Sequence, residues 1–221
     1  VNTQRVDGLI MLCVALRDDI LDLLRGANFP VCFVENDYED FDCVVVQNLK
    51  GGQKAAEFLC SKGCRKPGFI GEKSTFSYAV GATEERLRGF KFYCANNGIV
   101  IPENHIWLGN FSDGSIDANI LKFLEQDDLP DGIFCSSDVI AAKVMRIALQ
   151  KGILIPRDVL LIGFDNIDIA EYIGLTSVNQ NLEESGKMAA RMVLDRIKDS
   201  ERGISTMTLP ISVIERESTR N

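Results

Sequence analysis

Residues 152–186, GILIPRDVLLIGFDNIDIAEYIGLTSVNQNLEESG, decide the fold class of this chain. Val159 to Ile162 form a continuous apolar run, which is typical of a strand buried on both faces of a parallel sheet. The run ends at Gly163-Phe164-Asp165-Asn166, so a carboxylate follows directly on a buried strand. Open α/β sheets bind ligands at the carboxyl ends of their strands. Asp165 is therefore the first candidate for a ligand-binding residue.

Apolar strand candidates alternate with helical patterns along the whole chain, which predicts parallel βαβ units in a doubly wound α/β arrangement. Ile20, Leu23 and Leu24 fall at helical spacing and predict one buried stripe, as do Ala189, Val193 and Ile197 near the other end. The closing segment 207–214 contains a proline and predicts an edge strand. The other expected strands lie at 6–12, 31–34, 43–46, 67–71, 105–108 and 133–135.

The charge balance limits the classes of partner. The 221 residues include 24 Lys and Arg against 32 Asp and Glu, a net charge of −8. Nucleic-acid backbones attract proteins through clusters of Lys and Arg. An acidic chain without such a cluster binds nucleic acid poorly, so a DNA-linked protein would carry its basic part elsewhere. No run of 18 apolar residues is present, so we expect no membrane partner.

The seven cysteines do not predict a disulfide framework, because their number is odd and their spacing irregular. Cys60 and Cys64 are separated by three residues, but His105 is the only histidine in the chain. A structural zinc site usually needs four Cys or His ligands, so we expect no metal and no cofactor. Free thiols favour a cytoplasmic location.

Five motifs together resemble the LacI/GalR family of bacterial transcription regulators. They cover nearly the whole chain and include the glycine pair and the arginine that open two expected helices. The motifs are Gln47-Asn48-x-x-Gly51-Gly52, Arg86-x-x-Gly89-Phe90, the stretch from Gly152 to Asp165, Leu175-Thr-Ser-Val-Asn-Gln180, and Leu209-Pro210 to Arg216-Glu-Ser-Thr219. Ser137-Asp138 stands where the family usually has Asn-Asp.

The resemblance implies a domain organisation. Family members carry a helix-turn-helix head and a hinge helix before a core of two α/β lobes, with the periplasmic binding protein-like type I fold. Three strands join the lobes, and an effector binds between them. The first lobe would comprise 1–46 plus 178–206 and the second 47–177 plus 207–221, with the head absent from this chain and the first lobe incomplete. We expect crossovers near residues 46–47, 178–179 and 206–207.

The resemblance also implies a ligand site at Arg86, Phe111, Ser137 and Asp165, with Glu35 from the first lobe. Arg86 has forked donors that suit vicinal hydroxyls or a carboxylate, and a cation at a helix start needs a partner. Phe111 would cover a ring of the ligand, or else belong to a satellite core. Asp165 could instead be a solvated loop carboxylate, and Glu35 part of an exposed acidic loop.

The resemblance further implies a two-fold dimer interface at helix 138–151 and loop 166–175. The loop carries many apolar side chains, which mark interfaces when they are clustered and exposed. The alternative is that these side chains pack on their own lobe. The residues expected in the interface are Ala142, Met145, Ile169 and Tyr172.

Three functions compete. The first is the effector-sensing domain of a DNA-binding transcription regulator, a repressor, that binds a small polar effector such as a sugar, acts as a homodimer and reaches operator DNA through an N-terminal head. The second is an exported sugar-binding protein that feeds a transporter. The third is an enzyme of sugar metabolism, but we find no catalytic constellation in the sequence and expect none.

The start of the chain carries a separate expectation. Strands 6–12 and 31–34 are apolar on both faces, yet only the helices expected at 18–27 and 183–199 are available to cover them. Bare apolar strand faces and an open edge favour aggregation. We therefore expect that the 221 residues are not the whole natural core and that the isolated chain is poorly soluble.

Overall fold

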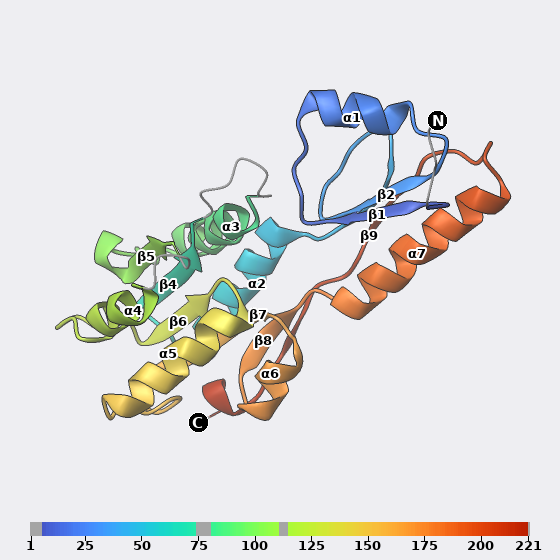
Figure 1. The fold of residues 1–221 in the computed structure, drawn as a ribbon. Helices are drawn as coiled ribbons and strands as arrows, with labels where there is room; N and C mark the ends of the chain where they lie inside the picture. Colours follow the sequence, from blue (N-terminus) through green and yellow to red (C-terminus); the bar gives the residue numbers. More distant parts are fainter. Residues whose placement is uncertain (1–5, 74–80, 111–114, 221) are drawn as a thin grey trace. The chain divides into compact units, whose positions relative to one another are not determined.

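The computed structural model describes residues 6–73, 81–110 and 115–220 (Figure 1). The chain forms two compact units, each built around its own sheet. Within the described residues, the first unit consists of 6–47 and 181–210, and the second of 48–73, 81–110, 115–180 and 211–220.

The first unit is a four-stranded parallel sheet with two helices. Its strand order is β1-β2-β3-β9. The strands are β1 (Leu9–Leu12), β2 (Val31–Val34), β3 (Asp42–Val45) and β9 (Thr206–Thr208), and the helices are α1 (Asp18–Arg25) and α7 (Leu182–Lys198).

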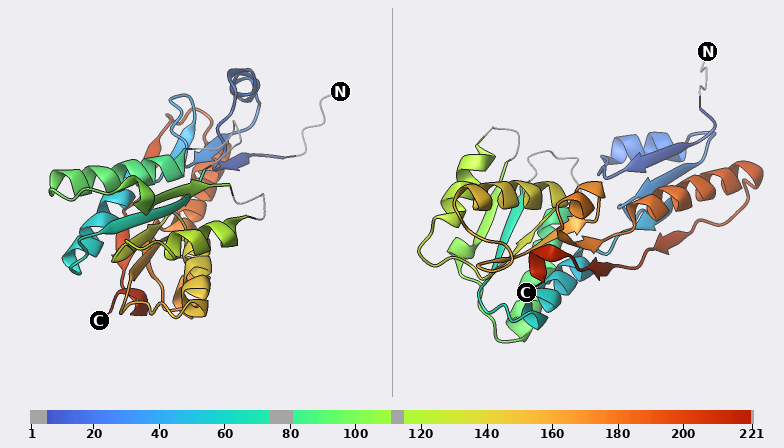
Figure 2. Two further views of the ribbon diagram at one scale, coloured as in Figure 1. Left: turned by 90° about the vertical axis from the view of Figure 1, so that its left-hand side faces the viewer. Right: turned by 90° about the horizontal axis from the view of Figure 1, so that it is seen from below.

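Strand β2 is covered on both faces because its side chains alternate. Phe33 belongs to the cluster that includes Leu21 of α1, whereas Cys32 belongs to the cluster that includes Ala189 and Val193 of α7. Figures 1 and 2 show the two helices on opposite faces of the sheet. The expectation of a strand buried on both faces is met here.

Strand β1 at the edge of this sheet is covered less well on one face than on the other. Leu9 and Met11 pack against the cluster that contains Leu21, but Ile10 is 36% and Leu12 57% exposed. The helices of the first unit expose apolar side chains as well.

The predicted stripes of these helices need two corrections. In α1 the buried residue is Leu21, while Leu23 is 70% exposed. In α7 Ala189 and Val193 are buried as expected, but Ile197 is 46% exposed. Helical spacing gives the period of a stripe, while the neighbouring sheet decides which side of the helix is covered.

The second unit is a six-stranded sheet with helices on both faces. Its order is β10-β8-β7-β6-β4-β5, parallel throughout except for antiparallel β10. The strands are β4 (Pro67–Glu72), β5 (Ile106–Gly109), β6 (Gly132–Cys135), β7 (Leu160–Asp165), β8 (Thr176–Asn179) and β10 (Ser212–Ile214). The helices are α2 (Asn48–Ser61), α3 (Ala82–Asn96), α4 (Ile116–Leu124), α5 (Asp138–Gln150) and α6 (Asp168–Tyr172), with short 3-10 turns at Glu103–His105 and Glu217–Thr219.

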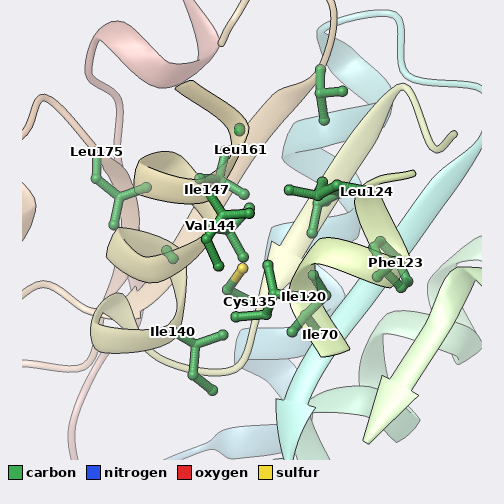
Figure 3. Packing of buried hydrophobic residues seen from close by; sticks show 14 of the residues in the cluster. Ile70, Ile120, Phe123, Leu124, Cys135, Ile140, Val144, Ile147, Leu161 and Leu175 are labelled. Carbon is green, nitrogen blue, oxygen red and sulfur yellow. The ribbon is translucent and has the colours of Figure 1, made fainter. Parts of the chain in front are cut away.

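The two faces of this sheet have different cores. Ile133 and Cys135 of β6 point into an aliphatic cluster with α4 and α5, part of which is shown in Figure 3. Phe134, between them in sequence, points to the other face, where its ring centroid lies 5.3 Å from those of both Phe69 and Phe90. This alternation gives the doubly wound arrangement that the sequence predicts.

The described chain passes between the units after Gln47, after Gln180 and after Pro210. These points lie a few residues further along than the crossovers placed from the sequence. Strand β8 stays in the second sheet and β9 in the first. The closing segment 207–214 is therefore not one edge strand, because Pro210 separates the ends of two strands that belong to different sheets.

Candidate functional site

Arg86 is held inside the second unit by hydrogen bonds and by a ring. Its Nε donates to Asn48 Oδ1 at 2.8 Å and its Nη1 to the backbone oxygen of Ser136 at 2.6 Å. The guanidinium carbon lies 3.6 Å from the centroid of the Phe164 ring, and the residue is only 6% exposed. Hydrogen bonds and stacking together fix the orientation of the cation.

Two glycines place Arg86 there. A Cβ at Gly52 of α2 would lie 1.9 Å from the backbone oxygen of Arg86, and a Cβ at Gly89 of α3 would lie 1.9 Å from that of Leu49. Only glycine allows the two helix backbones to approach this closely. The glycine pair and the Arg-x-x-Gly spacing of the sequence therefore encode a helix crossing next to the arginine.

Asp165 meets Arg86 at the carboxyl end of β7. Its Oδ1 lies 3.6 Å from Arg86 Nη1 and accepts a hydrogen bond of 2.6 Å from Gln180 Nε2. The Asp165 side chain is 20% exposed, against 8% for that of Arg86. The structure thus brings together the two residues that the sequence analysis singled out first, and of the pair the carboxylate is the more accessible to a ligand.

Asp165 and Asn166 form a turn with left-handed backbone. Their φ angles are 106° and 57°, a region that residues with side chains rarely adopt. Ser177 accepts a hydrogen bond of 3.0 Å from the Asn166 nitrogen, and Asp138 one of 2.9 Å from the Ile167 nitrogen. Buried side chains therefore hold the backbone that carries the candidate carboxylate.

Ser137 and Glu35 have other positions. Ser137 is the N-cap of α5, where its Oγ accepts a hydrogen bond of 3.4 Å from the Ile140 nitrogen. Its neighbour Ser136 supplies the oxygen that Arg86 binds. Glu35 follows β2 in the first unit, with a φ of 76°. Phe111 lies outside the described residues.

The sequence analysis missed three polar residues of this site. Asn48 and Gln180 stand in its motifs but received no role, and Asp138 was read only as part of a family pattern. Gln180 is 3% exposed, and its Oε1 has no hydrogen-bond partner among the described residues. Each of the three lies close after the end of a strand, which is the signal that could have identified them.

The Asp138 carboxyl group is fully buried, and this burial raises its pKa. Hydrogen bonds from Ser177 and from the backbone at Ile167 and Asn166 act in the opposite direction, as does the charge of Arg216. The net shift is upward. Burial therefore disfavours the charged form of Asp138, and the hydrogen bonds that the carboxyl group accepts partly offset this cost.

The residues predicted for a dimer interface have mixed surroundings. Tyr172 is 79% exposed, and Ala142 and Ile169 are half-buried. Met145 packs against the aliphatic cluster of its own unit. Val139, on the same helix, is 49% exposed. The surface of α5 and α6 thus offers apolar side chains without showing what covers them.

No three His, Cys, Asp or Glu side chains of the described ranges gather into a group that could hold a metal ion. None of the seven cysteines forms a disulfide bond with another described residue. No helix in the described part of the chain is long and apolar enough to cross a membrane.

Comparison with known proteins identifies relatives over nearly the whole chain. A family model described as periplasmic binding protein-like domain matches residues 56–219. The HTH-type transcriptional repressor PurR of Vibrio cholerae serotype O1 (strain M66-2) is 30% identical over 224 residues. That alignment covers 99% of this chain and 65% of the repressor, so the chain spans less than two thirds of that relative.

Two solved structures share the fold at 27% sequence identity, each with a TM-score of 0.82. One is a complex of the transcriptional regulator CelR with cellobiose. The match covers 98% of this chain and 67% of the CelR chain. The other is a LacI family transcriptional regulator from Enterococcus faecium with bound ribose, of which 79% is covered by 96% of this chain. The chain therefore belongs to the periplasmic binding protein-like domain family, and its relatives there are transcriptional regulators of the LacI type.

Proposed function

We propose that this chain is the effector-sensing part of a DNA-binding transcriptional regulator and that it binds a small polar ligand, a sugar or a sugar derivative, at Arg86 and Asp165. The observation that carries the proposal is the pairing of a partly exposed carboxylate with a buried, stacked guanidinium at the carboxyl edge of the sheet. Carboxylate oxygens accept hydrogen bonds from neighbouring sugar hydroxyls, and the Arg86 guanidinium, 3.6 Å from Asp165 Oδ1, helps to orient the carboxylate.

Gln180 adds a second polar contact to the proposed site. Its amide nitrogen is used by Asp165, whereas its buried Oε1 has no partner among the described residues. Buried polar atoms normally have hydrogen-bond partners. A ligand hydroxyl would supply that partner, and Ser137 and Glu35 are proposed as further contacts.

The relatives support the choice of ligand and of activity. One solved regulator holds cellobiose and another holds ribose. The repressor relatives are of the helix-turn-helix type, so we propose that the whole protein represses transcription and reaches operator DNA through a helix-turn-helix head. Coupling between effector and DNA sites is typically about 1–3 kcal/mol.

The proposed homodimer uses α5 and α6. Ala142, Ile169 and Tyr172 would contact the partner together with Val139, while Met145 would support them from the core side. Sedimentation of the whole protein at micromolar concentration tests this proposal. A strict monomer, with or without effector, would contradict it.

Ligand binding is tested by calorimetry and thermal denaturation with ribose, cellobiose and free nucleobases. A ligand present at 100 times its Kd should stabilise the protein by about 2.7 kcal/mol. Asp165→Asn should abolish this gain, because the neutral amide cannot accept the same hydrogen bonds. The matched control is Asp131→Asn, which changes a carboxylate of the same unit that accepts hydrogen bonds from the backbone of Arg65 and Lys66. Equal binding by the wild type and by Asp165→Asn would exclude the proposed site.

An exported sugar-binding protein is the competing function, because the matching family is described as periplasmic binding protein-like. The seven free cysteines favour the regulator. The first codons of the gene distinguish the two: a helix-turn-helix pattern supports the regulator, and a signal peptide supports the exported protein.

A further inference from the structure

The turn that carries Asp165 is intrinsically unfavourable. Asp165 and Asn166 both have positive φ, and neither is glycine. Side chains clash with the backbone in this region, so such residues persist only where their surroundings hold them. Groups of the second unit must therefore stabilise this turn.

Two fully buried side chains bond to the turn. Asp138 Oδ2 accepts from the Ile167 nitrogen at 2.9 Å, and Ser177 Oγ accepts from the Asn166 nitrogen at 3.0 Å. Ser177 in turn donates to Asp138 Oδ1 at 2.6 Å. The turn, the first residue of α5 and strand β8 are thereby joined in one network.

The local sequence is built for this network. Gly163 lies two residues before Asp165 and pairs with Ser177 across the sheet. A Cβ at Gly163 would lie 2.3 Å from Asp138 Oδ1, so the start of α5 can approach β7 only because this residue is glycine. The carboxylate therefore sits directly against the strand whose end bears Asp165.

Capping alone does not account for Asp138. The N-cap of α5 is already provided by Ser137. The carboxylate is 0% exposed and its pKa is raised by burial, which is a costly place for a charge. Its two oxygens are committed to Ser177 and to the turn. A buried charge with these partners is well suited to fix one backbone conformation.

We propose that Asp138 and Ser177 are positioning residues that hold the left-handed turn so that the Asp165 carboxylate faces Arg86. Neither residue needs to touch the ligand. The proposal deepens the proposed function and rests on it only for its effect on ligand affinity. Its effect on the turn can be measured without any ligand.

The first test is hydrogen exchange of the backbone amides of Asn166 and Ile167. Asp138→Asn removes a charged acceptor, and we expect both amides to exchange at least about tenfold faster. Ser177→Ala keeps the carboxylate and should accelerate Asn166 more than Ile167. It also serves if Asp138→Asn does not fold.

The matched control is again Asp131→Asn. Asp131 lies before β6, at the opposite end of that strand from Asp138, and it also accepts from two backbone nitrogens. It should destabilise the same unit without changing exchange at Asn166 and Ile167 beyond the change in unfolding. Unchanged exchange at both amides in Asp138→Asn and Ser177→Ala, or an equal change in Asp131→Asn, would overturn the proposal.

The second test uses ribose as the probe and calorimetry as the measurement. If the wild type binds ribose, Asp138→Asn should weaken Kd by at least about tenfold, while Asp131→Asn should leave it within about twofold. A merely structural role would lower both affinities in step with stability. If the wild type does not bind ribose, ribose is not its ligand, and the exchange measurement alone decides whether Asp138 and Ser177 position the turn.

Discussion

The two units of this chain are built on the same plan but are stabilised differently. In the second unit helices cover both faces of a six-stranded sheet, and aliphatic and aromatic clusters fill the two layers. In the first unit one helix covers each face of a four-stranded sheet, and the edge strand β1 exposes Ile10 and Leu12. Among the largest fully buried side chains of the described residues, Phe33 alone belongs to the first unit.

The first unit also contains an ion pair between Arg196 and the buried Asp42. Arg196 of α7 donates to both oxygens of Asp42 at 2.7 and 3.0 Å, and the Ser205 nitrogen donates to Asp42 Oδ1 at 3.0 Å. Asp42 is only 3% exposed. The wide sheet thus has the larger apolar core, while in the narrow sheet an ion pair ties helix α7 to strand β3. The ligand site proposed above lies in the unit with the larger core.

The largest effect is expected from Phe134→Ala in the second unit. Phe134 is fully buried between the rings of Phe69, Phe90 and Phe164, and its truncation should cost about 3–5 kcal/mol of unfolding free energy. Phe164 also supports Arg86, so ligand binding should weaken. Chemical denaturation measures the first effect and calorimetry the second.

Phe33→Ala is the counterpart in the first unit. It should accelerate amide exchange in β2 and β3 more than in β6 and β7.

If Phe134→Ala lowers the unfolding free energy by less than about 1 kcal/mol, the aromatic layer does not stabilise the second unit.

Asp42→Asn should selectively destabilise the first unit, by about 1.5–3 kcal/mol, because it removes hydrogen bonds to a charged group. Burial alone would raise the pKa of Asp42, but the bonds from Arg196 and Ser205 outweigh it, and the net pKa is lowered below the ordinary 3.8. The stabilisation is therefore complete above pH 3.8 and is lost as the pH falls through the lowered pKa.

Acid denaturation monitored by amide exchange in β3 and α7 measures this dependence. In Asp42→Asn the acid-side loss attributable to this group should disappear. If wild type and variant lose stability identically with falling pH, the clamp does not stabilise the first unit.

Gly52→Ala should separate α2 from α3 in the second unit. The new Cβ would meet the Arg86 backbone oxygen at 1.9 Å, so the helices must move apart, at a cost of about 1–3 kcal/mol. Arg86 moves with its helix, and the affinity for a ligand that binds Asp165 should fall as well. Denaturation and calorimetry on the same variant check both effects. Unchanged affinity would show that the close helix crossing does not serve the site.

Gly186→Ala is the corresponding change in the first unit, and it should have the smallest effect and the opposite sign. Gly186 lies in α7, is exposed, and no atom lies within 4 Å of a Cβ built there. Alanine has the higher helix propensity, so the variant should gain about 0.5–1 kcal/mol. A loss of stability on thermal denaturation would mean that α7 is constrained by contacts that its exposure does not reveal.

The sequence by itself determined the class of fold and the edge of the sheet at which the candidate site lies. The apolar run before Asp165 can be satisfied only in a strand covered on both faces, and a carboxylate that follows such a strand must lie at the ligand-binding edge. The Gly-Gly pair of α2 and the Arg-x-x-Gly of α3 are likewise local motifs, and they allow the two helices to cross closely. These features depend on neighbours in the chain, which a sequence displays directly.

Only the tertiary structure decided which side chains meet. Asn48 and Ser136 reach Arg86 across 38 and 50 residues, and Asp138 meets Ser177 across 39. No spacing rule connects positions so far apart, because strand order and register bring them together. The same holds for Leu21, buried where the period of the helix pointed to Leu23. The physical reason is that burial is a property of the partner surface, and a helix presents whichever side the sheet covers.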